Sequence, residues 1–361
     1  MGHSAQQPSW HSERRFVKVP TALDFTFVET DQLEEWISTS SSYPLALISF
    51  GASIPNLPPS VNCPTLSIDL PQLTEPARVE VWASAKPVRM IRNDNVSVAM
   101  NGEVAAAFLS VKESAGVALE ITTYHAYRSL LSELRELGYP YLWRAWNYFP
   151  AINDQESGLE RYQRFCIGRH QALLEALPDF PASLPAATAV GTASGPLQVY
   201  ALAGIYPARH LGNPRQVHAY EYPESYGPRS PSFSRATIAQ VDGSAQLFLA
   251  GTASVVGHAS RHVDSSKAQA RETLENIQTL LSHAQATSNT GSFVDPGNAL
   301  YKVYVRDAGD LGEIRQVIEN TPLVHTQIFF LHGHLCRREL LVEIEAIVTS
   351  DSGSACCNSS G

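Results

Sequence analysis

Two glutamates, Glu343 and Glu345, are the side chains whose spacing most clearly suggests chemistry. They lie in the stretch 336–348, in which every even-numbered position from Leu340 to Val348 is apolar. An apolar residue at every second position predicts a β-strand with one buried face. The two carboxylates share the opposite face, about 7 Å apart by the rise of a strand.

The face that carries the glutamates is not plainly open to water, because Leu341 and Ile347 lie on it as well. A carboxyl group among apolar neighbours has its charged form disfavoured, so its pKa rises and it can donate a proton at neutral pH. The alternative is an ordinary amphipathic strand with a solvated outer face. The pattern therefore leaves two interpretations of Glu343, a general acid or a solvated surface residue.

The elements before this strand follow a definite order from Ser232 onward. The order begins with a strand that ends in a Gly turn (FLAGTASVVGH) and a helix (AQARETLENIQTLL). A second strand and a second helix follow (LYKVYVRDAGDLGEIRQVIE), and the last strand is LLVEIEAI. This succession resembles the RidA/YjgF family, in which the first Glu of the last strand, here Glu343, lies in a ligand site between subunits. RidA-type deaminases hold the substrate carboxylate with an Arg at the start of the preceding strand, where this chain offers His325. This departure counts against imine hydrolysis of the RidA kind.

An earlier part of the chain repeats the same order of strands and helices. Its strands and helices match those of the later unit in the ranges 105–114, 119–140, 141–153, 158–177 and 181–204. One repeat of this length indicates two copies of an α+β domain and not a solenoid. By position, Val199 and Ala201 replace Glu343 and Glu345, so we expect the first copy to form a wall and the second to carry the acid.

The fold class expected is α+β, with each RidA/YjgF-like (chorismate-mutase-like) unit a mixed or antiparallel sheet that has two helices on one face. Because RidA proteins form trimers around a central cavity, the resemblance implies a pseudo-trimeric arrangement of units within one chain. Whether the first hundred residues supply a third sector stays open. The predicted divisions are a loose leader at 1–20, an N-terminal domain with a degenerate unit at 21–205, a connector at 206–232, a C-terminal domain with the catalytic Glu at 233–350 and a disordered tail at 351–361.

Composition excludes several classes of function. The 361 residues, 44% hydrophobic and 17% charged, describe an ordinary globular protein. A net charge of −9 argues against nucleic-acid binding, because no basic face could neutralise phosphates. No apolar run could cross a bilayer and no charged-then-apolar signal opens the chain, so we expect no membrane partner and a cytoplasmic location. We expect a monomer or a small homo-oligomer.

The cysteines show neither zinc-type spacing nor a disulfide framework. They are Cys63, Cys166, Cys336, Cys356 and Cys357. His332 and His334 lie close to Cys336, but no carboxylate or second Cys stands at ligand spacing. The sequence therefore predicts no metal site and no cofactor.

The connector concentrates cationic and aromatic side chains in an otherwise acidic protein. With its borders it holds Arg209, Arg215, Arg229 and Arg235, together with Tyr206, Tyr220, Tyr222 and Tyr226. Guanidinium groups combined with Tyr hydroxyls suit a small anionic ligand that carries carboxylates. The alternative is a structured linker whose arginines pair with surface acidic residues.

Six motifs in a fixed order make the resemblance more specific. They are WRAWNYFPAIN, LERYQRFCIGRHQA, GNPRQV, YGPRSPSFSRA, GTASVVGH and CRRELLVEIEA. Together they resemble the chorismatases, enzymes that are built on duplicated RidA-like units and remove pyruvate from chorismate. The resemblance spans roughly residues 104–347 and is weakest before that range.

The resemblance implies that Glu343 protonates the methylene carbon of the enolpyruvyl ether and creates an oxocarbenium-like centre. Glu345 either raises the pKa of Glu343 by like-charge repulsion or is merely solvated. Chorismate, the expected small-molecule partner, is a dianion whose carboxylates need fixed cationic partners and orienting hydrogen bonds. By position, the substrate-binding candidates are Tyr162, Arg169, Tyr222, Arg229, Arg235 and Arg306.

Branches of the family differ in product. Water attack leaves a dihydroxycyclohexadiene carboxylate, whereas attack by the ring hydroxyl gives a hydroxybenzoate. In the aromatising branches the resemblance puts a Cys seven residues before the catalytic Glu, where this chain has Cys336. It also puts a small residue in the facing strand, here Gly251 or Ala253.

Cys336 therefore joins Glu343 among the predicted catalytic residues, with the task of shaping the pocket and excluding water. The expected products are pyruvate and mainly 3-hydroxybenzoate, with 4-hydroxybenzoate as a second isomer. A dihydrodiol-forming chorismatase is one alternative. A RidA-like imine deaminase and a non-catalytic module that binds a small carboxylic acid are the others.

Overall fold

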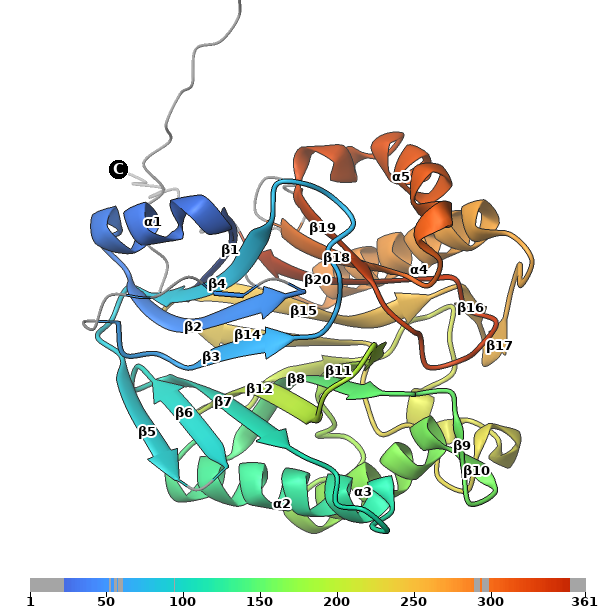
Figure 1. Ribbon diagram of the computed structural model, residues 1–361, viewed down its shortest axis with the longest axis horizontal. Coiled ribbons are helices and arrows are strands. Elements are labelled where there is room, and N and C mark those ends of the chain that lie inside the picture. The colour runs from blue at the N-terminus through green and yellow to red at the C-terminus, as the bar shows by residue number, and fades with distance from the viewer. Residues whose placement is uncertain are drawn as a thin grey trace, which may run out of the picture.

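The three larger β-sheets, formed by successive parts of the chain, face one another around a shared interior (Figure 1). The computed structural model describes residues 23–350 apart from 52, 55–56, 58–60, 94, 289–292 and 294–298. The predicted leader at 1–20 and the predicted tail at 351–361 lie outside the described residues. No described helix is both long and apolar enough to cross a bilayer.

The second and third sheets share one topology. The second runs β11-β8-β12-β7-β6-β5, made of β5 (Arg89–Asn93), β6 (Val96–Met100), β7 (Val104–Val111), β8 (Tyr141–Pro150), β11 (Ala186–Thr192) and β12 (Leu197–Gly204). The third runs β19-β18-β20-β15-β14-β13, made of β13 (Arg209–Leu211), β14 (Ala236–Val241), β15 (Ser244–Ala253), β18 (Ala299–Val305), β19 (Gln327–His332) and β20 (Val342–Thr349). Only β8–β11 and β18–β19 are parallel pairs in these two sheets. The matched order confirms the predicted duplication and the α+β class.

Two helices cover the outer face of each of these sheets (Figure 1). They are α2 (Leu119–Glu136) and α3 (Arg161–Ala176) on the second sheet, and α4 (Ser266–Thr287) and α5 (Leu311–Glu319) on the third. The apolar side chains of α2 that recur at helical spacing are buried against its sheet. This helix ends before Gly138, whose φ of +88° is a left-handed conformation that glycine adopts without steric cost.

The first sheet is a shortened version of the same unit. It runs β3-β2-β4-β1, made of β1 (Asp24–Glu29), β2 (Tyr43–Phe50), β3 (Thr65–Ile68) and β4 (Arg78–Ser84). Its parallel pair β2–β3 takes the place of β8–β11 and β18–β19. One helix, α1 (Leu33–Thr39), covers it. The N-terminal residues therefore supply the third sector of a pseudo-trimer, with two edge strands fewer and one long helix fewer than its neighbours.

Short elements connect the strands and helices, both within the units and between them. They are η1 (Thr30–Gln32), β9 (Gln155–Glu156), β10 (Leu159–Glu160), η2 (Ala219–Glu221), η3 (Glu224–Tyr226), β16 (Val255–Val256), β17 (Ala259–Ser260), η5 (Ala308–Asp310) and η6 (Pro322–His325). The connector predicted at 206–232 thus contains the edge strand β13, which pairs with β14 of the third sheet.

Alternation along β20 separates its two faces. Its even-numbered residues pack against α4 and α5, and they are Val342, Ile344, Ala346 and Val348. Each fully buried aliphatic side chain contributes roughly 1.5–3 kcal/mol to this packing. Glu343, Glu345 and Ile347 point the other way, into the interior between the sheets. The predicted strand and its two faces are therefore confirmed from Val342 onward, whereas Leu340 lies before the strand and packs in the interior.

The predicted equivalence of Val199 and Ala201 with the two glutamates is wrong. Both residues pack against the helices α2 and α3, on the outer face of β12. The interior positions belong to their neighbours, among them Tyr200 and Leu202. Side chains alternate along a strand, so a one-residue slip in a sequence match exchanges the two faces. The first copy presents aromatic and polar side chains to the interior.

Candidate active site

A cavity opens between the second and third units, with connector residues along one side. Its outer part has a volume of about 330 Å³, and it narrows inward to a space of about 40 Å³. A site of this size suits a small organic ligand. The two parts share the lining residues Tyr162, Pro231, Phe233, Gly251, Cys336 and Glu343.

Glu343 is the acid in the wall of this cavity. It is 4% exposed, and none of the ion pairs in the described part of the chain includes it. Burial raises the pKa of its carboxyl to about 8, and repulsion from Glu345 acts in the same direction. The opposing charges are those of Arg144, Arg235 and Arg306. Glu343 is therefore protonated at neutral pH and can donate a proton to a bound molecule.

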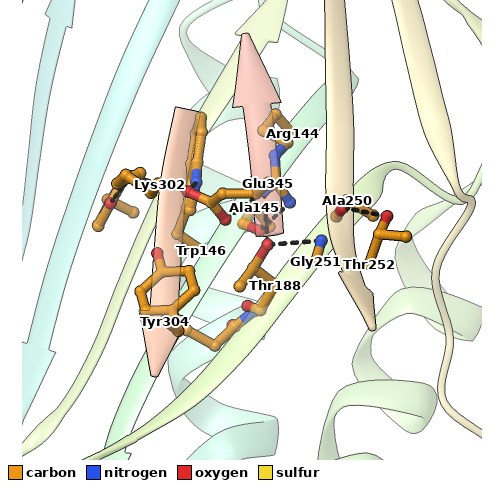
Figure 2. A network of polar contacts seen from close by, with 12 residues as sticks. Arg144, Ala145, Trp146, Thr188, Ala250, Gly251, Thr252, Lys302, Tyr304 and Glu345 are labelled. Atoms are coloured by element: carbon orange, nitrogen blue, oxygen red, sulfur yellow. Dashed lines mark hydrogen bonds and ion pairs between the residues drawn. The ribbon is translucent and has the colours of Figure 1, made fainter. Parts of the chain in front are cut away.

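Glu345, two residues further along, is held in the opposite state (Figure 2). Arg144 Nη2 and Lys302 Nζ each lie 2.8 Å from one of its oxygens, and the Trp146 indole N–H donates to it over 2.8 Å. Burial alone would raise the pKa of Glu345, but the two cations hold it below its ordinary value. One strand thus presents a protonated acid beside a fixed carboxylate. The alternative of a solvated strand face is wrong for both glutamates, because both are buried.

Gly251, on β15, makes room for the acid. A Cβ atom at this position would lie 1.9 Å from Glu343 Oε1, so any residue larger than glycine would displace the Glu343 carboxyl. The pairing of β15 with β20 shifts register between Leu249 and Thr252, which marks a β-bulge beside the cavity. Within this bulge the Gly251 N–H donates to Thr188 Oγ1 over 2.9 Å (Figure 2).

Two buried arginines have unused hydrogen-bond donors at the cavity. Arg235 donates from Nη2 to Tyr222 Oη over 2.6 Å, and its Nε has no partner among the described residues. Arg169 donates from Nε to Tyr127 Oη over 2.8 Å, and its Nη2 likewise lacks a partner within the described chain. Arg235 lines the outer part and Arg169 the inner part. This arrangement can hold a ligand with two carboxylates.

The inner part of the cavity is otherwise lined by neutral side chains, whereas the outer part also carries Glu160, Arg337, Arg338 and Glu339. Burial raises the pKa of the Cys336 thiol to about 12, so the thiol stays protonated at neutral pH and is no thiolate nucleophile. Cys166 is in the same state, with its pKa raised by burial to about 12, and it shares a hydrogen bond with Tyr162. Burial also raises the pKa of the Tyr162 phenol. A small, neutral Cys336 fits a role in shaping the pocket.

Eight of the ten predicted site residues line this one cavity. They are Tyr162, Arg169, Tyr222, Arg235, Gly251, Ala253, Cys336 and Glu343. Arg229 and Arg306 do not line it. Arg229 is exposed on the connector. Arg306 directs its guanidinium at the backbone carbonyls of Leu340, Leu335 and Arg337 and at Asn153 Oδ1, so it fixes the segment that leads into β20. His325 is exposed in η6.

Apart from Tyr162 and Arg169, sequence reasoning missed the residues that the first copy contributes to the site. Asn147, Phe165, Cys166 and Thr188 line the inner part of the cavity, and Arg144 binds Glu345 from behind. The sequence does contain one signal of this contribution, the polar pair Arg144 and Asn147 in an otherwise apolar strand. Buried polar groups need partners, so this pair indicates polar contacts in the interior. Among the described residues, no group of three or more His, Cys, Asp or Glu is arranged to hold a metal.

The duplicated units and the cavity between them define an enzyme that is built by repetition of one α+β domain within a single chain. Residues 80–203 match the family described as "Chorismatase FkbO/Hyg5-like, N-terminal". The chain belongs to the chorismatase family. It is 35% identical over 293 residues to a "3-hydroxybenzoate synthase" of Streptomyces hygroscopicus, which covers 79% of this chain and 85% of the relative.

Two further relatives agree with this assignment. A "Chorismatase" of Streptomyces rapamycinicus is 33% identical over 79% of this chain and 86% of its own length. A chorismatase crystal structure superimposes with a TM-score of 0.80 at 30% identity, over 91% of this chain and 99% of that chain. The resemblance to the chorismatases that the six motifs suggested is therefore confirmed.

Proposed function

We propose that this enzyme converts chorismate to pyruvate and a hydroxybenzoate, mainly 3-hydroxybenzoate. The observation that carries the proposal is a buried carboxyl that keeps its proton at neutral pH, in a cavity lined by two arginines that each have a buried donor without a partner among the described residues. The names of the relatives support the same substrate class. Eight predicted site residues in one place further support it.

Chorismate matches the charges of the cavity. It carries one carboxylate on the ring and one on the enolpyruvyl group, and the two arginines lie in different parts of the site. In the proposed complex, Arg169 holds one carboxylate in the inner part and Arg235, aligned by Tyr222, holds the other. Charge-assisted hydrogen bonds of this kind fix orientation as well as adding affinity.

The proposed reaction begins with proton transfer from Glu343 to the methylene carbon of the enolpyruvyl ether. That carbon becomes a methyl group, and positive charge develops at the ether carbon as an oxocarbenium-like centre. The neighbouring ring hydroxyl oxygen then bonds to the ring carbon that bears the ether while the bond from that carbon to the ether oxygen breaks, so pyruvate leaves and an epoxide remains on the ring, which opens as the ring aromatises. The aromatising ring releases one proton, which restores Glu343. No water is consumed, since chorismate and the two products have the same total composition.

The product assignment depends on keeping water away from the cationic centre. Cys336 beside Glu343 is small and neutral, and Phe165 and Phe233 contribute aromatic surface to the lining. These side chains offer a water molecule few hydrogen-bond partners. The name of the Streptomyces hygroscopicus relative supports 3-hydroxybenzoate as the main isomer. If water did attack, a dihydroxycyclohexadiene carboxylate would form instead.

The test is incubation of the purified protein with chorismate. Pyruvate is followed with lactate dehydrogenase, and the ring product is identified by chromatography against 3-hydroxybenzoate, 4-hydroxybenzoate and the dihydrodiol. We expect equal amounts of pyruvate and hydroxybenzoate. An absence of pyruvate would overturn the proposed activity, whereas equal amounts of pyruvate and dihydrodiol would overturn only the product assignment.

Activity should fall as pH rises through about 8. Only the protonated form of Glu343 can donate, and the pKa of this carboxyl is raised to about 8, so the active form disappears above that value. No loss from this group is expected between about pH 6 and about pH 7, where it stays protonated. The measurement is kcat/KM for pyruvate release across this range. A profile that stays flat up to about pH 10 would contradict the assignment.

Gly251→Ala should lower kcat by about 10- to 100-fold, because the added Cβ displaces the carboxyl from its reacting position. The fold should survive, since the atom that must move is the far end of a flexible side chain. Gly312→Ala on α5 is the matched control, because its Cβ would meet nothing within 4 Å. Steady-state kinetics on both variants provide the check, and equal kcat values would contradict the close approach.

A further inference from the structure

Four buried charges from all three units form one network in the interior. Lys302 Nζ lies 2.8 Å from Glu80 Oε2 and 2.8 Å from Glu345 Oε1, and Arg144 Nη2 lies 2.8 Å from Glu345 Oε2. Two anions and two cations balance. Their side chains are between 0% and 4% exposed. Glu80 comes from β4, Arg144 from β8, and Lys302 and Glu345 from β18 and β20.

Hydrogen bonds continue from this network to the wall of the cavity (Figure 2). Arg144 Nη2 donates to Thr188 Oγ1 over 2.6 Å, and the same oxygen accepts the Gly251 N–H. Gly251 is the residue that leaves space for the Glu343 carboxyl. Glu345 is therefore connected to Glu343 in two ways. One is along β20, where the two side chains share a face, and the other is through Thr188 and the bulge of β15.

We propose that Glu345 is a positioning residue for the catalytic acid, and that the network of Glu80, Lys302 and Arg144 fixes it as a permanent negative charge behind Glu343. This inference rests on the proposed function, because it assigns Glu345 a task in proton donation. Stability alone is a weak reason for such a network, since apolar side chains of similar volume often stabilise an interior at least as well. A fixed charge beside the acid gives the network a function.

Other ionisable groups also face Glu343. They are Tyr304, its register partner on β18, Arg144 from the second sheet, Arg235 and Arg306 beside the cavity, and Tyr162 and Cys336 in the lining. The arginines favour the carboxylate form of the acid, so without Glu345 the balance of charges would move toward ionisation. Glu345 opposes these arginines from a neighbouring position on the same strand.

The experiment measures the protonation of Glu343 directly and needs no turnover. Infrared difference spectra between wild type and Glu343→Gln isolate the C=O band of the protonated carboxyl, which is titrated with pH. The same titration is run in Glu345→Gln and in Glu345→Gln/Lys302→Met, which removes one charge of each sign and leaves Glu80 and Arg144 balanced. Glu80→Gln is the comparator, because it disturbs the network at the end away from the acid. Circular dichroism confirms that each variant is folded.

We expect the midpoint near pH 8 in wild type to fall by about one pH unit or more in both Glu345 variants, and by less in Glu80→Gln, because Coulomb energy falls with distance. The alkaline limb of the pH profile should move with it. Midpoints within about 0.3 pH units of wild type in every folded variant would overturn the inference, since a purely structural network would lower stability without moving the titration. A shifted midpoint in a protein that releases no pyruvate would overturn the proposed function alone.

Discussion

Glu343→Gln should reduce the rate of pyruvate release by about 10³-fold or more, which is the upper part of the range for general acid catalysis. The amide keeps the shape of the side chain but cannot transfer a proton to carbon. The fold should be intact, because the carboxyl of Glu343 takes part in none of the ion pairs of the described chain. Steady-state assays with chorismate, together with a thermal melt, make the measurement.

The same variant should change how stability depends on pH. Glu343 has its pKa raised from an ordinary 4.5 to about 8, so the folded state binds this proton more tightly than the unfolded state. The free energy of unfolding of wild type therefore decreases as pH rises from about 4.5 to about 8, by about 1.4 kcal/mol for each pH unit of pKa difference at most. Glu343→Gln lacks this dependence. Denaturant unfolding at several pH values tests it, and parallel slopes for the two proteins would contradict a buried, protonated acid.

Arg235→Met should reduce kcat/KM by about 10²- to 10³-fold, mainly through KM. Losing one buried charge-assisted contact to a carboxylate costs about 3–4 kcal/mol of binding free energy. The Arg235 Nε has no partner within the described chain, which leaves it available for such a contact. Methionine retains much of the apolar stem, so the packing around the site should change little.

The matched control for this variant is Arg209→Met, because Arg209 is an exposed arginine at the edge of the third sheet. We expect less than about a twofold change in kcat/KM for it, as for most surface substitutions. Kinetics at several chorismate concentrations separate KM from kcat for both variants. Equal effects of the two substitutions would show that Arg235 does not hold the substrate.

The fold was predictable where periodicity was strong. Apolar residues at every second position in 342–348 and at helical spacing in 119–134 reflect burial on one face, which local sequence records directly. The first sheet was not recognised as a third unit. It lacks the second long helix, and its strands are separated by Pro-rich segments that hide the repeat.

The site was predictable where one strand carries it and where the family resemblance supplies positions. Glu343 and its neighbour Glu345 stand out because carboxylates are rare on a strand with apolar flanks. The partners of Glu345 could not be found in this way. Lys302 lies 43 positions before Glu345 and pairs with it across the neighbouring strands β18 and β20, whereas Arg144 lies 201 positions before it and comes from the second sheet. Long-range contacts between units leave no local periodic signal.

The mistaken match of Val199 and Ala201 has the same origin. Sequence similarity between the two copies is too low to set the register within one residue, and a strand changes face at each residue. Arg229 and Arg306 illustrate a related limit. An arginine near a site in sequence can bind backbone carbonyls, as Arg306 does, or remain exposed, as Arg229 does.

The most direct test of proton donation to the enolpyruvyl carbon is turnover of chorismate in D₂O. Glu343 exchanges its proton with solvent, so each pyruvate should carry one deuterium in its methyl group, trapped at once as lactate to prevent later exchange. Mass spectrometry of the lactate reads this label. Unlabelled methyl groups would mean that a ring hydrogen moves to the methylene carbon within the substrate, and that Glu343 is not the acid.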